Sequence, residues 1–88
     1  MNCMGKKILV FSKNDCPQCP AAKVLGERLQ KKGQVVNQFD VDTADGLAEA
    51  SFYGVMSTPT IIIIDSDEEQ LAVWRGSVPA EDELLEFL

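Results

Sequence analysis

The feature that most constrains this chain is a pair of cysteines, Cys16 and Cys19, separated by two residues. The pair follows an apolar run of β-forming residues at positions 6–12 and precedes a segment with helical spacing that extends to about Lys32. Residues three apart on a helix share a face, and their backbones are close enough for a disulfide to form with little strain. The sequence therefore predicts a pair that cycles between dithiol and disulfide at a strand-to-helix junction.

The two cysteines are expected to have different roles. Cys16 is predicted to lie at the helix start, where unpaired amides and the helix dipole favour an anion and lower the thiol pKa below the ordinary value of about 8.5. Cys19 is predicted to lie one turn further and to be more covered. We therefore expect Cys16 to attack a substrate disulfide and Cys19 to resolve the mixed disulfide that results.

Three neighbouring residues, Lys13, Pro17 and Gln18, are candidates for a supporting role, and a fourth, Asp15, also bears on the thiol. Pro17 suits the first helical position because its missing N–H costs no hydrogen bond there, and Gln18 completes the turn between the cysteines. Lys13, three residues before the first cysteine, is placed to stabilise a thiolate. Asp15 would oppose the thiolate if its carboxylate points at the sulfur, or would cap the helix instead. The sequence leaves these two alternatives for Asp15 open.

The rest of the chain alternates β-type and helical runs, with no internal repeat or linker. After the first strand and helix we predict a strand at 35–41, a helix at 44–53, strands at 60–64 and 71–75, and a helix at 77–88. In the strand at 35–41, Val35, Phe39 and Val41 alternate with polar Asn37, and in the helix at 44–53, Leu47, Ala50 and Gly54 fall on one side. In the last helix, Leu84, Leu85 and Leu88 are predicted to face inward.

This β-α-β-α-β-β-α order determines the expected architecture. The first βαβ unit favours parallel pairing with a right-handed crossover, and the later hairpin adds antiparallel strands. The sequence thus predicts an α/β fold with a mixed four-stranded sheet and helices on both faces. It is expected to form a single domain over residues 1–88, with a loose N-terminal segment at residues 1–5.

Composition narrows the possible partners and the compartment. The formal net charge of −6 argues against nucleic acid, which requires a basic footprint. The longest apolar runs, residues 8–11 and 61–64, are too short to span a membrane or to form the core of a signal peptide. We therefore expect a cytoplasmic protein, and a monomer. In that reducing compartment a close cysteine pair is more often catalytic or metal-binding than structural.

A metal site is the main alternative interpretation of the cysteines. Zinc usually takes four Cys or His ligands. The chain has no histidine and only one further cysteine, Cys3, which is expected to be a bystander thiol on the loose terminus. The ligand count therefore argues against a metal, and the colour and metal content of fresh protein would test for a metal or iron–sulfur binding module.

A second motif, Thr58-Pro59, stands just before the strand predicted at 60–64. Proline can open a strand but not occupy the middle of a central one. The local sequence does not decide whether the Thr58–Pro59 bond is cis or trans.

Together, the cysteine motif after a first strand and Thr58-Pro59 before a later strand resemble the thioredoxin-like superfamily over nearly the whole chain. The residues at 11–19 resemble glutaredoxins. Those at 14–23 and 74–79 are most similar to NrdH-redoxins, which are glutaredoxin-sized proteins that behave like thioredoxins.

The resemblance implies further roles for residues and partners. Pro59 would be a cis-proline beside the active site, and the Thr58 backbone would pair with the substrate chain by strand addition. Proteins of the redoxin type are reduced by thioredoxin reductase and pass electrons to ribonucleotide reductase. They need no cofactor besides the redox-active disulfide.

Two departures from these families bear on the chemistry. The Gly-Gly-x-Asp segment with which glutaredoxins bind glutathione is absent from residues 74–79, and Asp15 stands at the mouth of the site. Both departures argue against the use of glutathione as the electron donor. A glutathione-dependent glutaredoxin, reduced by the glutathione system, is therefore kept only as the alternative within this class. Val10 replaces the buried aspartate of thioredoxins, so the proton of Cys19 must be exchanged with water, substrate or another group.

Overall fold

The computed structural model describes residues 5–88, and these residues form seven helices and strands. In chain order the elements are β1 (Lys7–Ser12), α1 (Cys19–Lys31), β2 (Val36–Asp40), α2 (Ala44–Phe52), β3 (Thr60–Ile64), β4 (Gln70–Arg75) and α3 (Glu81–Leu85). The predicted order of elements is confirmed. Cys3 and residues 1–4 of the predicted loose segment lie outside the described residues. Across residues 5–88, no helix is both long and apolar enough to cross a membrane.

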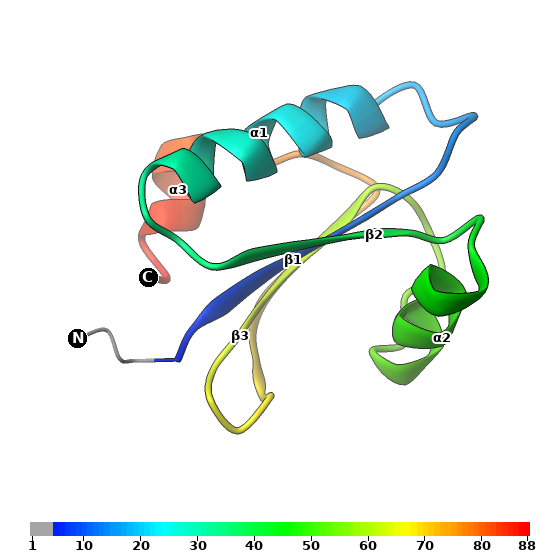
Figure 1. Ribbon diagram of the computed structural model, residues 1–88. Helices are drawn as coiled ribbons and strands as arrows, with labels where there is room; N and C mark the ends of the chain where they lie inside the picture. Colours follow the sequence, from blue (N-terminus) through cyan, green and yellow to red (C-terminus); the bar gives the residue numbers. More distant parts are fainter. Residues whose placement is uncertain (1–4) are drawn as a thin grey trace.

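The four strands form one mixed sheet in the order β2-β1-β3-β4 (Figure 1). β1 pairs in parallel with β2 and antiparallel with β3, and β3 pairs antiparallel with β4. The two central strands are buried on both faces, which explains why their sequences read as continuous apolar runs rather than as an alternation. The predicted mixed four-stranded sheet is confirmed.

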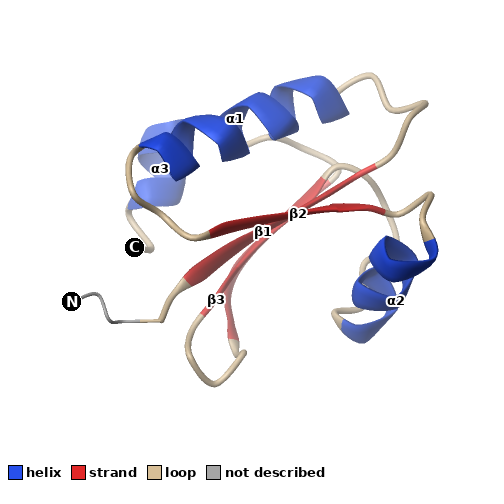
Figure 2. Cartoon of the chain, in the orientation of Figure 1, coloured by secondary structure: helices blue, strands red, loops and turns tan. Residues whose placement is uncertain are grey.

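Helices cover both faces of the sheet, as predicted: α1 and α3 lie on one face and α2 on the other (Figure 2). Successive side chains of β1 and β3 therefore contribute to two separate cores. The α1-side core contains Ile8, Val10, Ala22, Leu25, Leu29, Val36, Ile61, Ile63 and Leu84. The α2-side core contains Leu9, Phe11, Ala50, Ile62 and Ile64.

The buried residues of β2 and α2 differ from the groupings that the sequence suggested. In β2 it is Val36 that enters the α1-side core, whereas Val35 is exposed. In α2, Gly46 and Ala50 are buried, whereas Leu47 is exposed. The physical reason is a close approach, because a methyl group on Gly46 would overlap the backbone carbonyl of Asp40. α2 therefore packs through its smallest residues, and an apolar side chain that does not fit the contact is left in solvent.

The last helix is shorter than predicted and begins at Glu81 rather than at residue 77. Glu81 forms ion pairs with Lys32 and Arg28 near the end of α1, which connect the two helices on that face. The hydrogen bond from Lys32 is the main cause that lowers the pKa of Glu81. Leu84 is buried, and Leu85 and Leu88 pack partly buried against the same core, so the predicted inward face of this helix is confirmed.

Candidate active site

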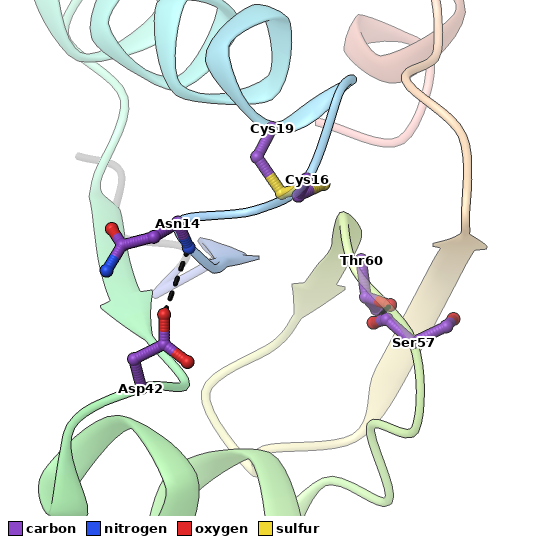
Figure 3. The surroundings of a disulfide bond; sticks show 6 residues. All are labelled: Asn14, Cys16, Cys19, Asp42, Ser57 and Thr60. Carbon is purple, nitrogen blue, oxygen red and sulfur yellow. Dashed lines mark hydrogen bonds between the residues drawn. A yellow bond between two sulfur atoms is a disulfide. The ribbon is translucent and has the colours of Figure 1, made fainter.

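The two cysteines lie between the end of β1 and the start of α1, and they form a disulfide (Figure 3). Their Cα atoms are 5.3 Å apart. Cys16 is 7% exposed and Cys19 is 1% exposed. The fold therefore brings the two predicted thiols together and leaves only the first of them a path to solvent.

The helix begins later than the sequence suggested. Gln18 is the N-cap of α1 and Cys19 is its first residue, because the first carbonyl in the helical ladder is that of Gln18, which accepts from the Ala22 N–H at 3.2 Å. Cys16 precedes the helix in a turn, closed by the Cys19 N–H donating to its carbonyl at 3.2 Å. The predictions that Pro17 occupies the first helical position and that Cys19 lies one turn in are thus wrong.

The N-terminus of α1 faces the reactive turn without a side-chain cap. Gln18 makes no capping hydrogen bond, and Pro20, in the first turn, has no N–H to donate. Asp15 does not cap the helix, so that alternative is not realised, and its side chain is exposed like that of Lys13. The dipole of α1 therefore remains available to stabilise a negative charge on the neighbouring sulfur.

The segment before β3 forms the other wall of the site. The Thr58–Pro59 peptide bond is cis, as the resemblance implied, and Pro59 is buried. The Thr60 hydroxyl donates to the Ser57 carbonyl at 2.7 Å, and the Gly76 N–H donates to the Pro59 carbonyl at 2.8 Å. In Figure 3 Ser57 and Thr60 lie on one side of the disulfide, and Asn14 and Asp42 on the other. The Gly76 bond thus ties residues 57–59, the proline loop, to the end of β4, and the Thr60 bond closes the loop itself.

A small cavity adjoins this loop on the α2 face of the sheet. It has a volume of about 200 Å³ and is lined by Lys13, Val41, Leu47, Ala50, Val55, Met56, Ser57 and Thr58. Two of these side chains are apolar but exposed: Leu47 at 56% and Met56 at 93%. Sequence reasoning placed Leu47 on one side of the helix with Ala50 and Gly54 and missed it as a site residue. The only signal that could have found it was the small residue beside it, Gly46, which marks the true contact face of the helix.

Three aromatic residues in the second half of the chain differ in their surroundings. Tyr53 packs against Phe11 at a ring distance of 6.2 Å, and its partial burial, more than the nearby glutamates, raises its pKa. Trp74 packs on the α1-side core and donates from Nε1 to Glu83 at 3.2 Å. Phe52, at the end of α2, is exposed. None of the three lines the cavity.

Sequence reasoning also missed a hydrogen bond at the loop that leads to the first cysteine. The backbone N–H of Asn14 donates to Oδ2 of Asp42 at 3.0 Å (Figure 3). Asp42 follows the end of β2 and is distant in sequence from the cysteines. No local pattern marks this bond, because the pairing of β1 with β2 creates it.

The interior offers little acid–base chemistry of its own. The buried polar residues in the described part of the chain are Ser12 and Thr60, and Val10 is fully buried in the α1-side core. In residues 5–88, no three Cys, His, Asp or Glu side chains are grouped so as to hold a metal ion. The redox chemistry of the site therefore centres on the two sulfur atoms.

Comparisons with known proteins identify similar chains. A family model described as a thioredoxin domain matches residues 6–88. A probable thioredoxin of Archaeoglobus fulgidus is 33% identical over 57 residues, which are 64% of this chain and 63% of that protein. The match thus spans less than two thirds of that relative's length. A thioredoxin of Methanocaldococcus jannaschii is 36% identical over 58 residues, covering 65% of this chain and 68% of that protein.

A solved structure of a thioredoxin is also similar to this chain. The fold is similar to that of a thioredoxin mutant from Halobacterium salinarum, with a TM-score of 0.78 and 26% identity. The superposition covers 94% of this chain and 71% of the other.

Proposed function

This chain belongs to the thioredoxin domain family, and from that premise we propose that it is a thiol–disulfide oxidoreductase that reduces disulfides of other proteins. The observation that carries the proposal is the disulfide between Cys16 and Cys19, which lies beside the N-terminus of α1 and the cis-proline loop. A nucleophilic sulfur, a second sulfur to displace its product, and a loop edge for a substrate chain are thus found in one place.

The reaction follows from the different exposure of the two sulfurs. The Cys16 thiolate attacks one sulfur of the target disulfide, the target S–S bond breaks, and the other target sulfur leaves as a thiolate that takes up a proton. Cys19 then gives up its proton, and its thiolate attacks the Cys16 sulfur of the mixed disulfide. The bond between Cys16 and the target breaks, and the second target sulfur leaves as a thiolate that takes up a proton. Two electrons and two protons pass to the target, and the Cys16–Cys19 disulfide forms. Because Cys19 is almost fully buried, it acts only after the target is attached.

An external donor must then return two electrons to the disulfide. We propose thioredoxin reductase as this donor and a protein such as ribonucleotide reductase as an acceptor, in the manner of an NrdH-redoxin in a reducing cytoplasm. Residues 74–79 lack the Gly-Gly-x-Asp segment that binds glutathione in glutaredoxins, and the Gly76 amide is already bonded to the Pro59 carbonyl. Exposed Asp15 would repel an anionic tripeptide.

An insulin-reduction assay with two electron sources tests this function. With NADPH and thioredoxin reductase we expect steady turnover; with glutathione, glutathione reductase and NADPH we expect little. Absence of turnover with both sources, despite a reduced and intact Cys16–Cys19 pair, would refute the oxidoreductase. Rapid turnover with glutathione alone would instead favour the glutaredoxin alternative, and near-stoichiometric metal in fresh protein would favour the metal-binding one.

We propose that the substrate chain lies against Thr58 and places an apolar side chain in the cavity beside it. Met56 is the most exposed apolar residue of that cavity, and it stands two positions before Thr58. A side chain this exposed contributes little to the free energy of folding. Its replacement therefore tests a contact with the substrate rather than the stability of the domain.

Replacement Met56→Asp is therefore expected to weaken protein substrates selectively. A buried charge in the contact should lower kcat/KM for insulin about tenfold, the equivalent of about 1.4 kcal/mol. The rate with hydroxyethyl disulfide, which has no peptide chain to lie against Thr58, should stay within about twofold. Phe52→Asp is the matched control, because Phe52 is also exposed but does not line the cavity. Equal losses with both substrates, or an equal loss in the control, would show that Met56 does not contact the substrate.

A further inference from the structure

The hydrogen bond between Asn14 and Asp42 lies where a backbone rung of the sheet would be expected. In a parallel ladder, alternate residues of one strand make the bonds to its neighbour. On β1 this series starts at Ile8 and ends at Ser12, whose carbonyl accepts from the Val41 N–H at 2.9 Å. The next donor in the series is the Asn14 N–H. Its acceptor is Oδ2 of Asp42 at 3.0 Å, a side-chain oxygen in place of a strand carbonyl.

The acceptor has a rigid support. The Asp42 N–H donates to Oδ1 of Asp40 at 2.9 Å, at the end of β2. The next residue, Thr43, is the N-cap of α2 and accepts from the Gly46 N–H at 3.0 Å. The Thr43 hydroxyl also donates to the Asp40 carbonyl at 2.7 Å. Strand end, turn and helix start are thus bonded to one another, and the Asp42 carboxylate projects from this junction.

The donor belongs to the segment that presents the reactive cysteine. Cys16 follows Asn14 by two residues, and the strand to which the segment is attached ends at Ser12. Within the described residues, the Asn14–Asp42 bond is the one hydrogen bond that ties residues 13–15 to another part of the fold. This bond therefore ties the segment before Cys16 to the end of β2, while the bond from the Cys19 N–H to the Cys16 carbonyl ties Cys16 itself to the start of α1.

We infer that Asp42 is a positioning residue for the reactive cysteine: by accepting the Asn14 N–H, it fixes the loop that holds Cys16 between the N-terminus of α1 and the proline loop. This inference rests on the proposed exchange at Cys16. Asp42 acts through Asn14 and does not touch the reacting sulfur atoms.

The positioning role can be separated from the effect of charge. A carboxylate near a thiolate opposes its ionisation, so loss of the charge alone should make Cys16 ionise more easily. Loss of the acceptor should have the opposite effect, because a loose Cys16 spends less time at the helix N-terminus. Asp42→Asn removes the charge and keeps an oxygen acceptor, whereas Asp42→Ala removes both. Asp42→Asn is therefore expected to lower the pKa of Cys16, and a rise of that pKa in Asp42→Ala, which loses the charge as well, can come only from the lost acceptor.

The test compares both variants of the full chain in three measurements. These are kcat and KM for insulin, the thiol pKa of Cys16 from the pH dependence of alkylation, and the hydrogen-exchange rate of the Asn14 amide. Asp42→Ala should lower kcat about tenfold, because a small misplacement of a reacting atom is costly. It should also raise the Cys16 pKa by about half a unit and speed exchange at Asn14. The kcat of Asp42→Asn should stay within about twofold of that of the unmodified chain. If the charge of Asp42 were responsible for its effect, Asp42→Asn would lose as much activity as Asp42→Ala.

Asp45→Ala is the matched control, since it removes the same charge from the first turn of α2, and melting temperatures verify that all variants are folded. The inference is overturned if Asn14 exchanges equally fast with alanine and with aspartate at position 42, or if Asp42→Asn loses as much activity as Asp42→Ala. If the unmodified chain reduces no disulfide, the proposed function fails instead, while exchange at Asn14 still reports whether Asp42 holds the loop.

Discussion

Replacement Cys16→Ser is expected to abolish disulfide reduction, with a loss of at least about a thousandfold in kcat/KM for insulin. The serine hydroxyl does not ionise near neutral pH, so no nucleophile remains at the position that faces the substrate. Cys19 cannot take its place, because it is almost completely buried beneath the turn. The rate of NADPH oxidation coupled to thioredoxin reductase measures the loss.

The companion replacement Cys19→Ser should give a different result. The first attack still occurs, but nothing displaces the target, so a mixed disulfide with Cys16 accumulates and is visible as an added mass in intact-protein mass spectrometry. Cys3→Ser controls for the loss of a thiol elsewhere in the chain. If Cys16→Ser keeps activity, or if Cys19→Ser turns over without trapping substrate, the assignment of the two sulfur atoms is wrong.

The second large effect concerns stability and is expected for Phe11→Ala. Phe11 is fully buried at the centre of the α2-side core, and its ring stacks on that of Phe39 at a centroid distance of 5.1 Å. Removing it eliminates the buried area and leaves a cavity that the surrounding strands cannot close. We expect the free energy of unfolding to fall by about 3–5 kcal/mol, a large share of the stability of so small a domain.

Denaturation by urea, followed by circular dichroism, measures this loss. Phe52→Ala is the matched control because the same side chain is removed from a site that is 69% exposed, where a change within about 0.5 kcal/mol is expected. The two-state slope of each curve must agree with that of the unmodified chain for the comparison to hold. Similar losses in the two variants would contradict the assignment of Phe11 to the core.

The order of helices and strands could be predicted because each element is marked by a pattern within a few neighbouring residues. β1 and β3 are recognisable as unbroken apolar runs, because strands that are buried on both faces have no polar side to alternate with. The cysteine motif was recognisable for a similar reason, since two thiols three residues apart can meet without help from the rest of the fold. The boundaries were less predictable, because α1 starts where its first carbonyl is bonded and not at the first favourable residue.

The amino-acid sequence alone thus determined the order of the elements, the layered α/β architecture and the identity of the two reactive sulfurs, because spacing within a few residues encodes each of these. Only the tertiary structure decided that Leu47 faces solvent beside the proline loop and that the Asn14 amide, ahead of Cys16, donates to Asp42. These features depend on how closely one element approaches another. The contact of Gly46 with Asp40 and the end of the β1–β2 ladder set that distance, and neither can be read from a window along the chain.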